Sequence, residues 1–407
     1  MLTLNAYIHK VDGVNGCLLI NTATSEVLDL GIEDADNLDK LMNQHVENNS
    51  LKEYLLKNGW MIETEDASDP EKLYQFDLES RGLTEFSLNK VIIEVSSECG
   101  LDCCFCNANK YSAFASCTCK RWNYKEVDID YTNIVEHLIS FRVQKVMIIG
   151  GDPFFYAFER LKSLLNKLNE KGYTGEIVIM SNGQSLSKEK IEFISKFKNV
   201  RVNIIFLGSN EEQYRTITRK KNVFKTVIKN VKLLKKYDVC VNGTFLVNSY
   251  NISDFENSEI NALGINIGIK YIFDEKYNAR GLIFSHNNRI LKIDYQSDKI
   301  LRETNCCLYS QVFIASNMKV YPCPYLRDFQ LGDLQNEQLY EIFRTGKYRE
   351  FWFLSKNKIE GCCSCKYNTV CMDCRAIEYS VTQDLYVEYF CDEVSQISSI
   401  KKSSEGK

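Results

Sequence analysis

The sequence has few prolines, no long apolar run and no excess of charge of either sign. No uncharged apolar stretch approaches the roughly 20 residues of a membrane-spanning helix, and the opening MLTLNAYIHKVDGVNG lacks the basic-then-apolar order of a signal peptide. Fifty basic and 54 acidic side chains leave a net charge of -4, which excludes a long-range field favouring nucleic acid or an anionic membrane. We therefore expect a cytoplasmic protein with neither as its partner.

Cysteine, in contrast, is abundant, with 17 in the chain. A disulfide framework is not expected in a reducing cytosol, so clustered cysteines indicate metal or redox chemistry. Isolated thiols such as Cys17 and Cys240 are expected to be ordinary buried residues. Three of the four prolines, Pro153, Pro322 and Pro324, lie beside glycine or cysteine motifs and so mark candidate sites.

The pattern of the chain changes several times along its length. Short apolar runs followed by helical spacing predict three strands and then two helices in residues 1–66. Strands and amphipathic helices then alternate, and beyond residue 300 the alternation stops and nine cysteines follow. We expect a small N-terminal domain (1–66), a linker (67–88), a strand-and-helix domain (89–290), a cysteine-rich domain (300–395) and a polar tail (396–407).

The central domain contains six candidate strands separated by amphipathic segments such as 159–172 and 224–237. This alternation favours an α/β fold, a partial (β/α)6 barrel of parallel strands with its site at the strands' C-terminal ends. The flanking domains are expected to be a winged-helix-like α+β unit and a cysteine-rich iron-sulfur unit. The strands are predicted at 91–95, 145–149, 176–180, 200–206, 239–247 and 267–273.

The stretch ECGLDCCFC directly follows the first predicted barrel strand. The spacing Cys99-x3-Cys103-x2-Cys106 lets a short loop give three thiolates to an iron-sulfur cubane and leaves one iron without a protein ligand. Zinc is the competing reading, but a structural zinc site needs four ligands, and Cys104 faces away if its neighbours converge.

This loop, with Phe105 before its last cysteine, resembles that of the radical S-adenosylmethionine (radical SAM) enzymes. The resemblance implies a 4Fe-4S cluster on Cys99, Cys103 and Cys106, whose open iron chelates the amino and carboxylate groups of S-adenosylmethionine. Reductive cleavage of that cofactor then yields a 5'-deoxyadenosyl radical, which abstracts a substrate hydrogen. An electron donor such as flavodoxin or ferredoxin is implied as a partner.

Later segments also resemble motifs of this family. The run Gly150-Gly151-Asp152-Pro153 is similar to the Gly-Gly-Glu-Pro motif that binds the methionine amino group, although a plain turn is the alternative and Asp152 is shorter than glutamate. Ser181 and Asn182 stand where a Thr-Asn-Gly turn approaches the cofactor. Arg219 stands where an arginine pairs with the cofactor carboxylate, with Arg215 and a solvated basic run as competitors.

The C-terminal cysteines are too numerous for one metal site. They resemble the SPASM extension of radical SAM enzymes that act on peptides, which binds two auxiliary 4Fe-4S clusters. A zinc-ribbon module is the non-enzyme alternative. By resemblance the outer cluster takes Cys362, Cys365, Cys371 and Cys391, and the inner one Cys323, Cys374 and one or both of Cys306 and Cys307.

One further pair of cysteines lies in the loop after the first cluster motif. Cys117 and Cys119 are interpreted as reduced thiols in this loop, with approach to the substrate as the alternative.

The same resemblance predicts the substrate. SPASM-bearing relatives mostly modify ribosomally made peptides (RiPPs), and the N-terminal unit resembles the small domain that captures leader peptides as an added edge strand. A stabilising cap is the alternative. We expect a peptide maturase that installs a cross-link, a thioether being one form; an epimerase or a carbon-carbon cross-linker remains open.

A sulfatase-maturating, formylglycine-forming enzyme is the second candidate. Those relatives, however, place an aspartate directly after the inner cysteine, where Pro324 follows Cys323 in this chain.

Overall fold

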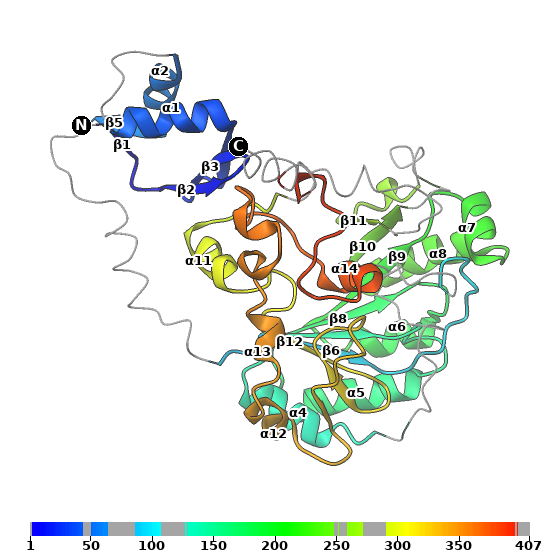
Figure 1. Cartoon of the computed structure of the whole chain (residues 1–407). Helices are drawn as coiled ribbons and strands as arrows, with labels where there is room; N and C mark the ends of the chain where they lie inside the picture. Colours follow the sequence, from blue (N-terminus) through cyan, green and yellow to red (C-terminus); the bar gives the residue numbers. More distant parts are fainter. Residues whose placement is uncertain are drawn as a thin grey trace. The chain divides into compact units, whose positions relative to one another are not determined.

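The computed structural model describes residues 2–43, 50–63, 86–106, 127, 129–247, 251, 259–271, 290–394 and 397. The chain divides into two compact units (Figure 1). Residues 87–281 and 310–351 form the sheet unit, and residues 1–86, 282–309 and 352–407 form the cysteine-rich unit. Each unit is described by itself. No helix in the described ranges is long and apolar enough to cross a membrane.

The sheet unit is built on a nine-stranded sheet with the order β11-β10-β9-β8-β7-β6-β12-β13-β14. The strands from β6 to β11 are parallel, and all six correspond to predicted strands. The α/β fold is that of a partial barrel, as predicted from the sequence. Its strands are β6 (Lys90–Glu94), β7 (Lys145–Ile149), β8 (Glu176–Ser181), β9 (Val200–Phe206), β10 (Cys240–Val247) and β11 (Ile267–Tyr271).

Three more strands continue this sheet, and the sequence did not reveal them. Strand β12 (Gln311–Ile314) pairs in parallel with β6, and β13 (Lys319–Tyr321) and β14 (Gly332–Asp333) follow antiparallel. The segment 300–395, expected as one domain, therefore contributes to both units. The residues of β12 and β6 that pair are more than 200 positions apart, so no local sequence pattern indicates that the two strands are neighbours.

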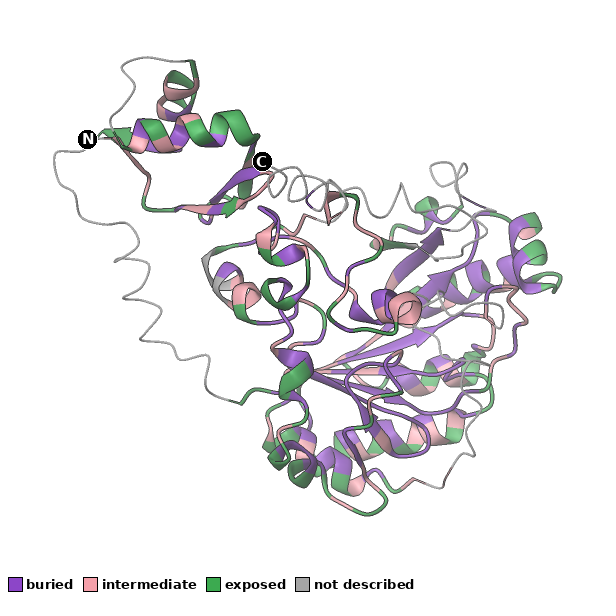
Figure 2. Ribbon diagram, in the orientation of Figure 1, coloured by how far each residue is buried: buried purple, intermediate pink, exposed green. Residues whose placement is uncertain are grey.

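Helices connect the parallel strands of this sheet (Figure 1). In α5, for example, Leu161, Leu164, Leu165 and Leu168 are buried at helical spacing. Figure 2 shows the central strands of this sheet as mostly buried, whereas the edge strand β11 is largely exposed. The helices are α4 (Thr132–Ser140), α5 (Phe158–Glu170), α6 (Lys188–Ile194), α7 (Glu211–Thr218), α8 (Val223–Lys236), the 3-10 helix η2 (Asn261–Leu263), α12 (Leu339–Arg344) and α13 (Arg349–Trp352).

The N-terminal part of the cysteine-rich unit holds a three-stranded antiparallel sheet, β2-β3-β4, followed by two helices. The three strands and two helices expected in residues 1–66 are present, and a two-stranded pairing of β1 with β5 is additional. The elements are β1 (Leu2–Leu4), β2 (Ile8–Gly13), β3 (Gly16–Asn21), β4 (Glu26–Leu30), α1 (Ile32–Met42), α2 (Ser50–Lys57) and β5 (Met61–Glu63).

The C-terminal part of this unit is made of short helices and turns. They are α11 (Tyr295–Glu303), the 3-10 helices η4 (Lys356–Lys358) and η5 (Cys362–Ser364), and α14 (Arg375–Thr382). Cys17 on β3 is fully buried, as expected of an ordinary thiol. The same expectation is wrong for Cys240, which is exposed at the start of β10.

Candidate functional site

The cysteine loop directly follows β6 and is held by backbone hydrogen bonds. The amide of Cys106 donates to the carbonyl of Cys103 at 3.0 Å, which closes a turn, and the amide of Cys104 donates to the carbonyl of Ile217 at 2.9 Å. Phe105 is buried, while all four cysteines of the loop are half-buried. The loop therefore presents thiols from a fixed backbone. Cys117 and Cys119 lie outside the described residues.

The sulfur of Cys99 accepts two hydrogen bonds. It accepts from the amide of Leu101 and from Nδ2 of Asn182, both at 3.4 Å. Hydrogen bonds to a cysteine sulfur tune the reduction potential of a cluster bound to it. Asn182, predicted to lie near the cofactor, thus reaches the loop that follows β6 from the end of β8.

The glycine pair after β7 lets two chain segments approach closely. The amide of Gly151 donates to the carbonyl of Ser96 at 2.9 Å, and that of Asp152 to the carbonyl of Glu98 at the same distance. A Cβ on Gly150 would lie 2.3 Å from the Ser96 carbonyl oxygen, and one on Gly151 would lie 2.2 Å from that of Glu98. Only glycine fits at these positions without moving the segment that leads into the cysteine loop.

Asp152 has a buried carboxylate, of which one oxygen accepts hydrogen bonds. Oδ1 accepts from the amide of Phe154 and from the hydroxyl of Ser181, both at 3.0 Å, whereas the buried Oδ2 has no hydrogen-bond partner in the described part of the chain. Burial raises the pKa of Asp152 to about 6, and these hydrogen bonds oppose the rise. A buried carboxylate oxygen without a donor fits an ammonium group, which would supply both the charge and the hydrogen bond.

Arg219 lies at the end of α7, in a left-handed conformation with φ of 58°. Its guanidinium is 3.8 Å from a carboxylate oxygen of Asp102, within the cysteine loop, and the side chain is 69% exposed. The neighbouring Lys220 donates from Nζ to the carbonyl of Gly100. Sequence reasoning named Arg219 but missed the contacts of Asp102 and Lys220, because nothing in the local pattern indicates which loop this basic run faces.

The C-terminal cysteines are distributed over both units. Cys323 follows β13 in the sheet unit, where it is buried and its sulfur accepts from the amide of Tyr325 at 3.3 Å. The other predicted inner ligands, Cys306, Cys307 and Cys374, belong to the cysteine-rich unit. No three cysteine, histidine or acidic side chains among the described residues are arranged to hold a single metal ion.

The predicted outer ligands all belong to the cysteine-rich unit. Cys362 and Cys365 are buried at η5 and its end, and Cys371 and Cys391 are half-buried. Burial, together with the nearby thiols of Cys371 and Cys391, raises the pKa of Cys365 to about 11. Binding of a metal or cluster would drive deprotonation of such a thiol, because the thiolate is the form that ligates.

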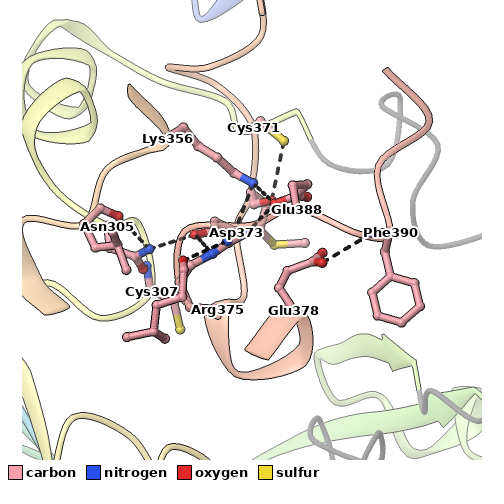
Figure 3. A network of polar contacts seen from close by, with 12 residues as sticks. Asn305, Cys307, Lys356, Cys371, Asp373, Arg375, Glu378, Glu388 and Phe390 are labelled. Atoms are coloured by element: carbon pink, nitrogen blue, oxygen red, sulfur yellow. Dashed lines mark hydrogen bonds and ion pairs between the residues drawn. The ribbon is translucent and has the colours of Figure 1, made fainter. Parts of the chain in front are cut away.

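A buried network of charges holds the segments that carry these cysteines (Figure 3). Asp373 forms ion pairs with Arg375 at 2.6 Å and with Lys356 at 3.2 Å, and Lys356 also pairs with Glu388 at 2.8 Å. Burial opposes ionisation of Asp373, but the two cations hold its pKa well below the usual range. Because these side chains come from separate turns, the network fixes the turns relative to one another.

The same network reaches the adjacent pair Cys306 and Cys307. Nδ2 of Asn305 donates to Asp373 at 2.8 Å while its Oδ1 accepts from the amide of Cys307 at 3.0 Å. The amide of Asp373 in turn donates to the sulfur of Cys306 at 3.2 Å. The sequence offered no signal for this network beyond the presence of charged residues between cysteines.

Known proteins similar to this chain agree with its fold and cysteine pattern. Residues 93–259 match the Radical SAM superfamily, and residues 306–375 match the SPASM iron-sulfur cluster-binding domain. A cysteine-type anaerobic sulfatase-maturating enzyme of Clostridium novyi (strain NT) is 23% identical over 344 residues, which are 70% of this chain and 87% of that protein.

Two solved structures have a similar fold. Native anSMEcpe with bound AdoMet and Kp18Cys peptide matches with a TM-score of 0.56 and 19% identity, over 78% of this chain and 99% of that one. Streptococcus suis SuiB bound to precursor peptide SuiA matches with a TM-score of 0.52 and 15% identity, over 96% and 100%.

The parallel partial barrel and the three-cysteine loop after its first strand agree with the Radical SAM match, and the chain is an enzyme. The chain contains a Radical SAM domain at residues 93–259 and a SPASM iron-sulfur cluster-binding domain at residues 306–375. Its cofactors are therefore 4Fe-4S clusters and S-adenosylmethionine. The residues present fit this assignment, since the orphaned oxygen of Asp152 and the hydrogen-bonded sulfur of Cys99 lie on neighbouring loops of one sheet.

Proposed function

We propose that this protein is a peptide maturase that installs a covalent cross-link in a ribosomally made precursor peptide. Cys99, Cys103 and Cys106 hold the first cluster, Asp152 receives the amino group of S-adenosylmethionine, and Asn182 orients Cys99. When bound, this cluster and its cofactor supply a 5'-deoxyadenosyl radical. Gly150, Gly151 and Ser181 shape the pocket around the cofactor, and Phe105 and Arg219 lie at its edge.

The observation that carries the proposal is the N-terminal sheet. Strands β2, β3 and β4 form a small antiparallel sheet with two edges, and helices α1 and α2 follow it. An edge strand is a site where an extended peptide adds by backbone hydrogen bonds. The likeness to the SuiB structure extends over 96% of this chain, which supports a similar arrangement of domains.

A sulfatase-maturating activity is the second candidate, since curated relatives carry that name. The residue after Cys323 argues against it. Pro324 stands there, and its carbonyl accepts from Nε of Arg327 at 2.9 Å, so this position offers no carboxylate to act as a base. The proposed partners are a leader-bearing precursor peptide and a flavodoxin-like or ferredoxin-like donor; a cytoplasmic location remains a prediction.

The activity is tested by anaerobic incubation with S-adenosylmethionine, a reductant and candidate precursor peptides. We expect 5'-deoxyadenosine together with a peptide that has lost two hydrogen atoms, as a new cross-link requires. Conversion of a cysteine in a sulfatase-derived peptide to formylglycine would support the second candidate instead. Deoxyadenosine without a change in any peptide would count against both.

The binding edge is tested separately with a labelled precursor. Successive residues of an edge strand point their amides to opposite sides, one toward the neighbouring strand and one outward. Val27→Pro and Leu28→Pro on β4 therefore remove one amide of each kind. The variant that loses the outward-pointing amide keeps the pairing with β3 and is expected to stay folded. If β4 receives the leader, this variant loses leader binding. Unchanged binding in that variant would exclude β4 as the binding edge.

A further inference from the structure

The turn between β2 and β3 lies against the cysteine-bearing turn at η5. The amide of Val14 donates to the carbonyl of Ser364 at 2.9 Å, and the amide of Lys366 donates to Oδ1 of Asn15 at 3.2 Å. A Cβ on Gly13 would lie 2.2 Å from the backbone nitrogen of Lys366, so the two backbones are in direct contact. The N-terminal hairpin thus forms one wall of the segment that carries Cys365.

The side chain of Asn15 reaches the sulfur itself. Its Nδ2 donates to Oε2 of Glu393 at 2.8 Å and lies 3.9 Å from Sγ of Cys365, within reach of an N–H···S hydrogen bond. The orientation of the amide follows from its partners, because a backbone amide faces Oδ1 and a carboxylate faces Nδ2. Both hydrogens of the Asn15 amide group are therefore in use, one of them toward the cysteine.

The hairpin is anchored firmly enough to hold this contact. Val11, Leu18 and Ile20 share one buried core with Tyr367 and Val370. Lys366 also pairs with Asp29 and donates to the carbonyl of Leu30 at 3.0 Å. These contacts come from β2, β3 and β4 together, so Asn15 is carried by a rigid element and not by a free loop.

We propose that Asn15 is a positioning residue of the outer cysteine group, donating to Cys365 and thereby tuning the cluster held there. The inference rests on the proposed role of Cys365 as a cluster ligand. Hydrogen bonds to cysteine sulfurs stabilise the reduced, more electron-rich state of a cluster and raise its reduction potential. The peptide-binding part of the chain thus contributes directly to an auxiliary cluster.

The test uses full-length protein carrying Cys99→Ala, Cys103→Ala and Cys106→Ala, so that only auxiliary clusters contribute to the spectrum. In this background Asn15→Leu is compared with Asn43→Leu, whose amide donates only within helix α1 in the described structure. An EPR-monitored redox titration and iron analysis are the readouts. We expect Asn15→Leu to shift an auxiliary midpoint potential to more negative values at unchanged iron content, and Asn43→Leu to shift none.

The possible results distinguish failure of the role of Asn15 from failure of the auxiliary-cluster assignment. An unchanged potential in Asn15→Leu, at full iron content, would overturn the role of Asn15 and leave the auxiliary clusters in place. Loss of thermal stability with the potential unchanged would show a purely structural contact and also overturn it. If the variant that lacks Cys99, Cys103 and Cys106 binds no iron, the auxiliary-cluster assignment itself is overturned.

Discussion

At the scale of single residues, Asp152 combines burial with an oxygen that has no donor among the described residues. Its folded pKa, raised by burial to about 6, lies above the ordinary value of 3.8. The folded state then binds a proton more tightly than the unfolded state between these values. The contribution of Asp152 to stability is accordingly unfavourable above about pH 6 and improves as the pH falls toward 4.

Asp152→Asn should therefore change stability and cofactor affinity in opposite directions. At pH 7.5 we expect the cofactor-free variant to gain about 2 kcal/mol in the free energy of unfolding, and to bind S-adenosylmethionine roughly tenfold or more weakly. Denaturant unfolding and calorimetry measure the two effects. Asp130→Asn, at a surface position before α4, is the control and should leave affinity unchanged. Equal affinity in the Asp152 variant would contradict the assignment.

The cysteines of the loop should differ in whether the first cluster requires them. Cys104→Ala is expected to retain the first cluster and cofactor cleavage, because the Cys104 backbone is held by the Ile217 carbonyl and its thiol is not a predicted ligand. Cys103→Ala is expected to lose both. Iron content and deoxyadenosine formation distinguish the variants, and the reverse result would show that the ligand register is wrong.

At the scale of elements, the ends of β6 and β7 are held together by backbone contacts that leave no room for a side chain. Gly151→Ala would place a methyl group against the carbonyl of Glu98. We expect a loss of about 1 to 3 kcal/mol in the free energy of unfolding and loss of cofactor cleavage. Gly268→Ala on β11 meets no atom within 4 Å and is the matched control. Full activity in Gly151→Ala would argue against close contact between these loops.

Strand β6 is also tied to the loop that follows Cys323. Glu94 and Arg327, both buried, are paired at 2.8 Å, and Glu94 accepts from the hydroxyl of Ser316 at 3.1 Å. Arg327→Met should cost about 3 to 5 kcal/mol because it leaves a buried carboxylate without its cation. Adding Glu94→Gln should recover much of that loss. A double variant as unstable as the single one would show that the loss does not come from the unpaired charge of Glu94.

At the scale of the whole molecule, the N-terminal sheet shares its core with the cysteine-bearing turns of the same unit. Removal of residues 1–66 should therefore abolish leader binding and also expose Val370, Tyr367 and the turn at Cys365. We expect the truncated protein to lose auxiliary iron and thermal stability, while cofactor cleavage persists because its residues lie in the sheet unit. Iron analysis and deoxyadenosine formation test both parts. Retention of all auxiliary iron would show that the sheet is a separable module.

The sequence by itself determined the parts of this protein that depend on local order. The alternation of strand and helix patterns predicted the positions of the six parallel strands. The spacing of Cys99, Cys103 and Cys106 predicted the cluster loop. Both patterns lie within short stretches of the chain and can therefore be recognised without the fold.

Only the tertiary structure decided which distant segments meet. It paired β12 with β6, brought Arg327 to Glu94 and set Asn15 beside Cys365, and it left Cys240 exposed. These contacts join residues up to 350 positions apart, so they follow from the packing of whole elements, which no short stretch of sequence encodes.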